Sequence, residues 1–301
     1  MVKTRQHPVM VTAPVNRIEI EYESFGDPAD PALLLVMGLG GQMTSWDDEL
    51  CRQLAGKGFH VIRFDNRDVG LSTKMEGTAA PDVMTVLQGD TSGVAYTLAD
   101  MAADAAGLLD ALGIDAAHIV GVSMGGMIAQ QLAIDHPDKV LSLASIMSTT
   151  GAGDVGAPTD EAIAVVTRLP PETREEVIAS EVESTRLLGS PGFAFDEERT
   201  GRRAAAAYDR SFYPVGTARQ LVAIVASGDR TTGLSRLDVP TVVIHGDADP
   251  LVTPSGGVAT AKAIPGAELV MVEGMGHELP PAAWPTVIEA IVANARSGGP
   301  R

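Results

Sequence analysis

The distribution of short apolar runs most limits the folds open to this chain. Residues 33–37 read Leu-Leu-Leu-Val-Met, a continuous run typical of a central strand covered on both faces. Comparable strand patterns, separated by helical ones, recur at 60–64, 118–122, 141–147, 241–245 and 268–272. An alternating segment at 17–24 predicts one half-buried antiparallel strand. Strands that alternate with helices indicate a mostly parallel sheet flanked by helices, so the predicted fold class is α/β.

The alternation of strands and helices stops in the middle of the chain. Between 151 and 238 no buried-strand pattern is found, and helical patterns take its place. These patterns lie at 171–188, 197–208 and 217–226. We therefore predict a core domain made of residues 1–150 and 239–301, into which residues 151–238 are inserted as a helical cap.

A Gly-x-Ser-x-Gly pattern marks a candidate nucleophile. Residues 121–125 read Gly-Val-Ser-Met-Gly, directly after the predicted strand 118–122 and before a helix predicted at 127–135. In that context Ser123 is expected on a sharp strand-to-helix turn, where the flanking glycines leave room for the chain to double back. The alternative is a plain glycine-rich turn, which the strand and helix on either side disfavour.

A serine hydroxyl is a weak nucleophile near neutral pH and needs a general base. Among the six histidines we assign this role to His277, which lies in a Gly-Met-Gly-His loop just after the last predicted strand. His60 and His118 begin strands, where a structural role is more common. A glycine-flanked loop can carry the His277 imidazole back over the sheet.

The third member of such a site must hold the imidazole in the right tautomer and stabilise its cation. Asp247 and Asp249 both follow the predicted strand 241–245. Asp249 is favoured because it completes a His-Gly-x-x-Asp pattern that begins at His245. For Asp247 the alternative is a turn residue that bonds to its own backbone. Ser123, Asp249 and His277 all follow the carboxyl ends of predicted parallel strands, where open α/β sheets place their ligands.

Attack on an ester carbonyl creates an oxyanion, which backbone N–H groups must receive. One donor is expected to be the amide of Met124, the residue after the nucleophile. The other is expected to be the amide of Leu39, in the Gly-Leu-Gly turn that follows the first central strand. A phosphate-binding turn is the alternative here, but the segment lacks both the Lys-Ser/Thr of a P-loop and the Gly-x-Gly-x-x-Gly spacing.

On these motifs the chain resembles the α/β-hydrolase superfamily, and within it the branch of aclacinomycin methylesterase and bacterial carboxylesterases and lipases. The resemblance rests on residues 27–38, 121–125 and 274–277, and on the pattern Asp-x-Arg-Asp-x-Gly-x-Ser at 65–72. It implies an α/β-hydrolase fold with a mostly helical cap, an acyl-enzyme mechanism and no cofactor. Many relatives carry His-Gly where this chain has Met-Gly at 37–38, which leaves the anchoring of that loop open.

The expected function is therefore that of a serine carboxylic ester hydrolase, acting on a small or lipophilic ester such as a methyl ester, a lipid ester or a thioester. The same scaffold can serve as a lactonase, a C–C hydrolase, a perhydrolase or an aminopeptidase, since fold does not fix function. A binding protein without catalysis is the alternative from another class. It would have no need to keep Ser123, Asp249 and His277 together.

An ester group of appreciable size requires an apolar pocket, and the cap is where we expect its walls. At least one of five cap aromatics is predicted to line a pocket over Ser123; for any single ring, packing of the cap onto the sheet is the alternative. These aromatics are Phe193, Phe195, Tyr208, Phe212 and Tyr213.

Two further features were weighed for function. Arg67 and Asp68 could contact substrate, but a structural ion pair that holds their loop is the favoured interpretation. Cys51, the only cysteine, is expected on a helix face under the sheet, with nothing nearby that indicates a reactive thiol.

Charge and composition narrow the partners. A formal net charge of −17 repels phosphate backbones, so we do not expect a nucleic acid partner. The motifs described above predict a small-molecule ester as substrate. No His-Glu-x-x-His and no Cys/His cluster with ligand spacing indicates a metal. The first residues carry charge without an apolar region behind them, and the longest apolar run, 32–41, is too short to cross a bilayer. We expect a cytoplasmic enzyme; the sequence does not indicate its oligomeric state.

Overall fold

The computed structural model describes residues 11–78, 82–169 and 171–297, so the N-terminal segment used to judge secretion lies outside the described residues. In the described part, a sheet of eight strands has the order β1-β2-β4-β3-β5-β6-β7-β8. Its strands are β1 (Val11–Val15), β2 (Ile18–Phe25), β3 (Ala32–Val36), β4 (His60–Phe64), β5 (Ala117–Val122), β6 (Val140–Ile146), β7 (Thr241–Gly246) and β8 (Glu268–Val272). Pairing is antiparallel for β1–β2 and β2–β4 and parallel from β4 to β8, which confirms a mostly parallel sheet.

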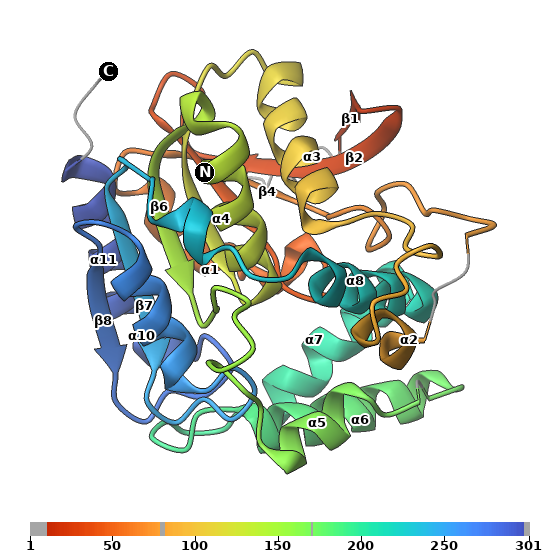
Figure 1. The fold of residues 1–301 in the computed structure, drawn as a ribbon. Coiled ribbons are helices and arrows are strands. Elements are labelled where there is room, and N and C mark those ends of the chain that lie inside the picture. The colour runs from red at the N-terminus through yellow and green to blue at the C-terminus, as the bar shows by residue number, and fades with distance from the viewer. Residues whose placement is uncertain (1–10, 79–81, 170, 298–301) are drawn as a thin grey trace, which may run out of the picture.

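Helices cover both faces of this sheet (Figure 1). On one face α3 (Leu98–Ala111) and α4 (Met124–Asp135) pack in one apolar cluster, and on the other α1 (Asp48–Ala55) and α11 (Trp284–Ser297) pack in a second. Strand β3 serves both clusters because successive side chains point to opposite faces: Leu34 belongs to the first and Leu35 to the second. This two-sided burial is why the strand reads as an unbroken apolar run.

The strand register brings the catalytic candidates to one edge of the sheet. Val36 of β3 lies opposite Gly121 of β5, and Val122 of β5 lies opposite Ile146 of β6. The carboxyl ends of β3, β5, β6 and β7 therefore lie side by side. The loops that follow these strands meet there, as expected for an α/β sheet.

Between β6 and β7 the described residues form helices and no strand. Figure 1 shows α5, α6 and α7 together beyond the carboxyl edge of the sheet. The helices of this stretch are α5 (Asp160–Val166), α6 (Arg174–Leu188), α7 (Glu197–Arg210), α8 (Pro214–Ser227) and α9 (Thr231–Leu234). The division into a core domain and a cap of residues 151–238 stays a prediction; below, "the cap" denotes this stretch.

Helix boundaries follow local capping. The helix predicted from 171 begins at Arg174, because Thr173 and Glu176 form a reciprocal capping box at its start. Helix α4 begins at Met124, three residues earlier than predicted, since the amides of Gly126 and Met127 already bond to the carbonyl of Ser123. The remaining helices are α2 (Val83–Leu87), α10 (Pro254–Ala263) and the short 3₁₀ turns Met43–Ser45, Pro137–Lys139 and Pro281–Ala283. Throughout the described ranges, every helix is too short or too polar to cross a membrane.

Candidate active site

Ser123 occupies a strained turn between β5 and α4. Its backbone has φ 55° and ψ −123°, a region that L-residues rarely adopt. The flanking glycines are required for space: a Cβ at Gly121 would clash with the carbonyl oxygen of Gly125, and one at Gly125 with that of Val36. Neither glycine has a positive φ, so close approach of the backbone, not conformational freedom, explains both residues.

The structure brings Ser123, His277 and Asp249 into one hydrogen-bonded chain. Nε2 of His277 lies 2.9 Å from Oγ of Ser123, and Nδ1 of His277 lies 2.8 Å from Oδ2 of Asp249. The Asp249 side chain is fully buried, and its Oδ1 accepts the amides of Leu251 and Val252, each at 2.9 Å. Because Oδ1 is occupied by two donors, Oδ2 is held toward the imidazole.

Asp247, the alternative third member, and His245, whose Nε2 lies 3.6 Å from Oδ2 of Asp249, are both outside the chain of bonds that ends at Ser123. Asp247 accepts the amide of Gly274 at 2.6 Å, so it binds the loop that carries His277 and not the turn on which it lies, which was the alternative considered for it. His245 is fully buried and lies 2.7 Å from the carbonyl of Val252 through Nε2. Burial lowers the pKa of His245, which favours a neutral imidazole that donates to this carbonyl.

The loop after β3 runs beside the serine. A Cβ at Gly38 would lie 3.2 Å from Cβ of Ser123. Two of the loop's amides have partners: that of Gly40 donates to Oε1 of Gln220 at 2.9 Å and that of Gly41 to Gly38. Within the described residues the amides of Leu39 and Met124 donate to no other protein group. Met124 starts α4, where helical amides lack an intrahelical partner.

Side chains from other segments anchor this loop, which answers the question raised by Met37. Nδ2 of Asn66 donates to the carbonyl of Met37 at 2.9 Å, and Asp65 accepts the amide of Met43 at 2.7 Å. Gln220, from the cap helix α8, adds the bond to Gly40. Sequence reasoning missed Asn66 and Gln220. The position of Asn66 just after β4 is a local signal that could have identified it, whereas Gln220 had none.

Arg67 and Asp68 do not pair with each other, so the predicted ion pair between them was wrong. Arg67 pairs with Asp104 of α3 at 2.6 Å, and Asp68 accepts two bonds from Arg219 of α8 at 2.8 and 2.9 Å. All four side chains are buried. Burial, the largest single influence, would raise the pKa of Asp68, but hydrogen bonds, chiefly from Arg219 and the Met75 amide, together with the charge of Arg219, outweigh it and lower that pKa. Arg67 and Asp68 therefore point to different helices. The first pair connects α3 to the loop after β4, and the second connects α8 to the same loop.

Cys51 lies on α1 and is fully buried against the sheet, as predicted. Burial raises the pKa of its thiol to about 12, so a thiolate does not form near neutral pH.

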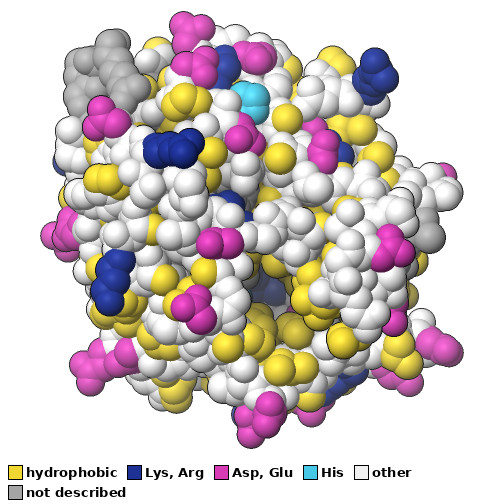
Figure 2. All heavy atoms as spheres, in the orientation of Figure 1, with side chains coloured by type: hydrophobic (Ala, Val, Ile, Leu, Met, Phe, Trp, Pro, Cys, Tyr) yellow, Lys and Arg dark blue, Asp and Glu magenta, His cyan; other side chains and the backbone are white. Residues whose placement is uncertain are grey.

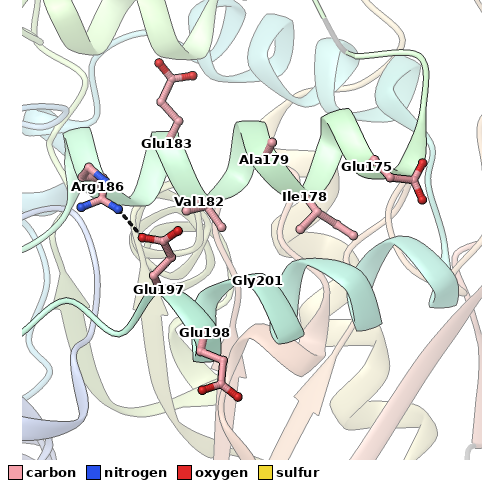
Figure 3. Close-up of a pocket in the computed structure, with 9 residues that line it drawn as sticks. All are labelled: Glu175, Ile178, Ala179, Val182, Glu183, Arg186, Glu197, Glu198 and Gly201. Atoms are coloured by element: carbon pink, nitrogen blue, oxygen red, sulfur yellow. Dashed lines mark hydrogen bonds and ion pairs between the residues drawn. The ribbon is translucent and has the colours of Figure 1, made fainter.

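The stretch 151–238 carries two grooves whose lining residues do not include Ser123, Asp249 or His277. A groove of about 780 Å³ lies between α6 and α7 (Figure 3), where Ile178 and Val182 point toward α7. Its lining residues are Glu175, Ile178, Ala179, Val182, Glu183, Arg186, Glu197, Glu198 and Gly201. Figure 2 shows a hollow on the face in view, with hydrophobic side chains along part of its border.

The cap aromatics divide by their contacts. Phe195 lies under the Arg186 guanidinium, 4.6 Å from ring centre to carbon, and the Tyr213 hydroxyl accepts from Arg219. Phe193 packs on the apolar cluster between the sheet and α11. Tyr208 and Phe212 contact each other, with ring centres 4.9 Å apart. That a cap ring lines the pocket over Ser123 stays a prediction.

Nowhere in the described ranges do three or more His, Cys, Asp or Glu side chains converge as metal ligands would.

A family model and two curated relatives match this chain over most of its length. The family described as the alpha/beta hydrolase fold matches residues 31–280. The chain is 32% identical to rhodomycin D methylesterase of Streptomyces peucetius over 295 residues, which cover 91% of this chain and 94% of that protein. It is 33% identical to rhodomycin D methylesterase of Streptomyces sp. (strain C5), over 91% of this chain and 94% of that protein.

Among solved structures, the enol-lactonase of Burkholderia xenovorans LB400 superimposes with a TM-score of 0.73 at 23% identity. The match covers 95% of this chain and 100% of that chain. At this identity the likeness concerns the fold alone.

Proposed function

The chain belongs to the α/β-hydrolase family, and on that premise we propose that it is a serine ester hydrolase in which Ser123 is the nucleophile, His277 the general base and Asp249 the residue that orients and stabilises the imidazole. The observation that carries the proposal is the continuous chain from Asp249 through His277 to Ser123, with contacts of 2.8 and 2.9 Å. Ester hydrolysis itself is supported by the methylesterase relatives.

In the proposed reaction, Oγ of Ser123 attacks the ester carbonyl carbon and its proton passes to Nε2 of His277. The carbonyl oxygen becomes an oxyanion that accepts the amides of Leu39 and Met124. When the tetrahedral intermediate collapses, the alcohol leaves with the proton from His277, and the acyl group stays on Ser123. Water then attacks the acyl-enzyme, gives its proton to His277 and releases the acid; the proton returns to Ser123.

The substrate that we propose is a methyl ester, so that methanol is the leaving alcohol. The support is the identity of about one third to two methylesterases that align over most of this chain. Lipid esters and thioesters are the other members of the same class, since they pass through the same acyl-enzyme. The hydrophobic side chains along part of the hollow's border in Figure 2 suit an apolar acyl group.

The test combines active-site labelling with an ester panel. A fluorophosphonate should label the protein on Ser123, and Ser123→Ala should abolish both labelling and hydrolysis while the protein still folds. The loss in kcat should be on the order of 10⁴-fold or more. Ser142→Ala is the matched control, because that buried serine lies on β6 and bonds to His118, away from the site. A Ser123→Ala variant with a tenth of the normal rate would remove Ser123 as nucleophile.

The panel should separate the proposed activity from the others that this fold supports. Methanol release from methyl esters, with p-nitrophenyl esters of increasing chain length beside them, would support the esterase proposal. Labelling without ester turnover, but with ring opening of lactones, would favour a lactonase. Failure to label at all would favour a binding protein without catalysis.

A further inference from the structure

The catalytic histidine is attached to the cap through its backbone. Four hydrogen bonds join residues 188–193, which run from the last residue of α6 toward α7, to the loop 274–278; we call the two segments the link and the His277 loop. They run from the His277 amide to the Leu188 carbonyl (2.7 Å), from the Gly276 amide to Ser190 Oγ (3.0 Å), from the Ser190 amide to Glu278 Oε1 (2.9 Å) and from the Gly192 amide to the Gly274 carbonyl (2.9 Å).

The two segments approach as closely as backbones can. A Cβ at Gly276 would clash with the carbonyl oxygen of Gly189, and a Cβ at Gly192 would lie 2.7 Å from Cα of Gly274. Gly274 also has a φ of 68°. Side chains at these positions would separate the link from the loop, so the glycines serve the contact as well as the turn.

The core holds only the first half of the His277 loop. The Gly274 amide donates to Asp247, and Met275 exchanges backbone bonds with Val272 and Ala248. In the second half of the loop, 276–278, the amides of Gly276 and His277 donate to the link. The His277 backbone is therefore positioned by a segment of the cap, not by the sheet that positions Ser123.

We propose that Ser190 is a positioning residue for the general base, so that the cap sets the rate of the chemical step as well as the choice of substrate. This inference rests on the proposed function. The Ser190 side chain accepts the Gly276 amide while its own amide is accepted by Glu278, the residue after His277. Ser190 thus bonds to the loop on both sides of the histidine, and it is buried.

The expected effect follows from how strongly the rate of proton transfer depends on the distance between the base and the proton donor. A base must lie at about 2.6–3.2 Å from the proton donor, and a displacement of about 1 Å can cost about a hundredfold in rate. Ser190→Ala removes the acceptor of a buried amide and lets the loop shift. We expect kcat to fall about ten- to a hundredfold, with KM within about twofold of the wild type, because the loss acts on the chemical step.

The experiment measures kcat and KM with p-nitrophenyl acetate, with rates normalised to active sites titrated by fluorophosphonate. Ser190→Thr keeps the hydroxyl and should restore kcat to within about threefold, which loss of stability alone would not predict. Ser180→Ala is the matched control. This serine lies on α6 of the same cap, and its side chain accepts a bond from Arg168, which is not part of the His277 loop. Glu278→Gln keeps the acceptor for the Ser190 amide and should be near normal, whereas Glu278→Leu should resemble Ser190→Ala.

Each outcome bears on the proposal. A loss of kcat in Ser190→Ala and Glu278→Leu, restored in Ser190→Thr and Glu278→Gln, supports it. Normal kcat per active site in Ser190→Ala overturns it, as does a loss that is equal in Ser190→Thr. If Ser190→Ala does not fold, normal kcat in Glu278→Leu overturns the inference in its place. If Ser123→Ala keeps its activity, the proposed function fails instead, whatever the Ser190 variants do.

Discussion

Replacing Asp249 by asparagine should trap His277 in the wrong tautomer. Oδ1 of Asp249 accepts the amides of Leu251 and Val252, so the amide oxygen of an asparagine must take that place. Its NH₂ group then faces Nδ1 of His277, which has to accept the bond. The imidazole proton is thereby placed on Nε2, the atom 2.9 Å from Oγ of Ser123. A protonated Nε2 cannot take the proton of the nucleophile.

The size of the effect follows from this geometry. All three hydrogen bonds of the side chain are kept, so the fold should be retained and the unfolding midpoint should change little. The base, however, is unavailable in the dominant tautomer, and kcat should fall about 10⁴-fold, equivalent to about 5 kcal/mol of transition-state stabilisation. KM should change much less, since no proposed substrate contact is removed.

The assay is steady-state hydrolysis of p-nitrophenyl acetate, with circular dichroism as a check on folding. Asp247→Asn is the matched control: its amide oxygen can still accept the Gly274 amide, so its rate should stay within about threefold of normal. A folded Asp249→Asn variant with more than about one hundredth of normal kcat would refute the tautomer argument. The reverse pattern, with Asp247→Asn inactive, would assign the third member to Asp247.

Two other perturbations test the buried groups around the site. Arg219→Met should lower the free energy of unfolding by about 3–5 kcal/mol in urea titrations, because it leaves the Asp68 carboxylate buried without its cation; a loss below about 1 kcal/mol would contradict this. The pKa of Asp68 is lower in the folded than in the unfolded protein, so the Arg219–Asp68 pair contributes its full stabilisation above the unfolded pKa of about 3.9. This stabilisation is lost as pH falls through the folded pKa, and Arg219→Met should not show that loss of stability at acid pH. Cys51, whose pKa burial raises to about 12, should react with a thiol reagent at pH 8 only after unfolding, and rapid labelling of the native protein would argue against its burial.

The sequence alone determined the fold class and the three residues of the candidate site. Strand periodicity and the spacing around Ser123 arise between neighbours in the chain, so they can be read locally. Both Asp247 and Asp249 follow a strand, so Asp249 was chosen on the His-Gly-x-x-Asp pattern and His277 on its glycine-flanked loop; parallel strands that end at a common edge then bring the two together.

Local patterns misled where tertiary packing demanded an unfavourable residue. Helix α10 was not predicted, because Gly256 and Gly257 lower its helix propensity. In the structure a Cβ at Gly257 would clash with the ring of His245. A glycine, although a weak helix former, is therefore required at 257 so that α10 can pack against His245, which lies beside Asp249.

Only the tertiary structure decided which side chains hold the site together. Arg67 and Asp68 are adjacent, yet their partners lie 37 and 151 positions away on different helices. The bonds that the Gly40 amide donates to Gln220 and the Gly276 amide donates to Ser190 span 180 and 86 positions. Pairs so distant leave no periodic signal in one sequence, because the packing of whole helices on the sheet determines which of them meet.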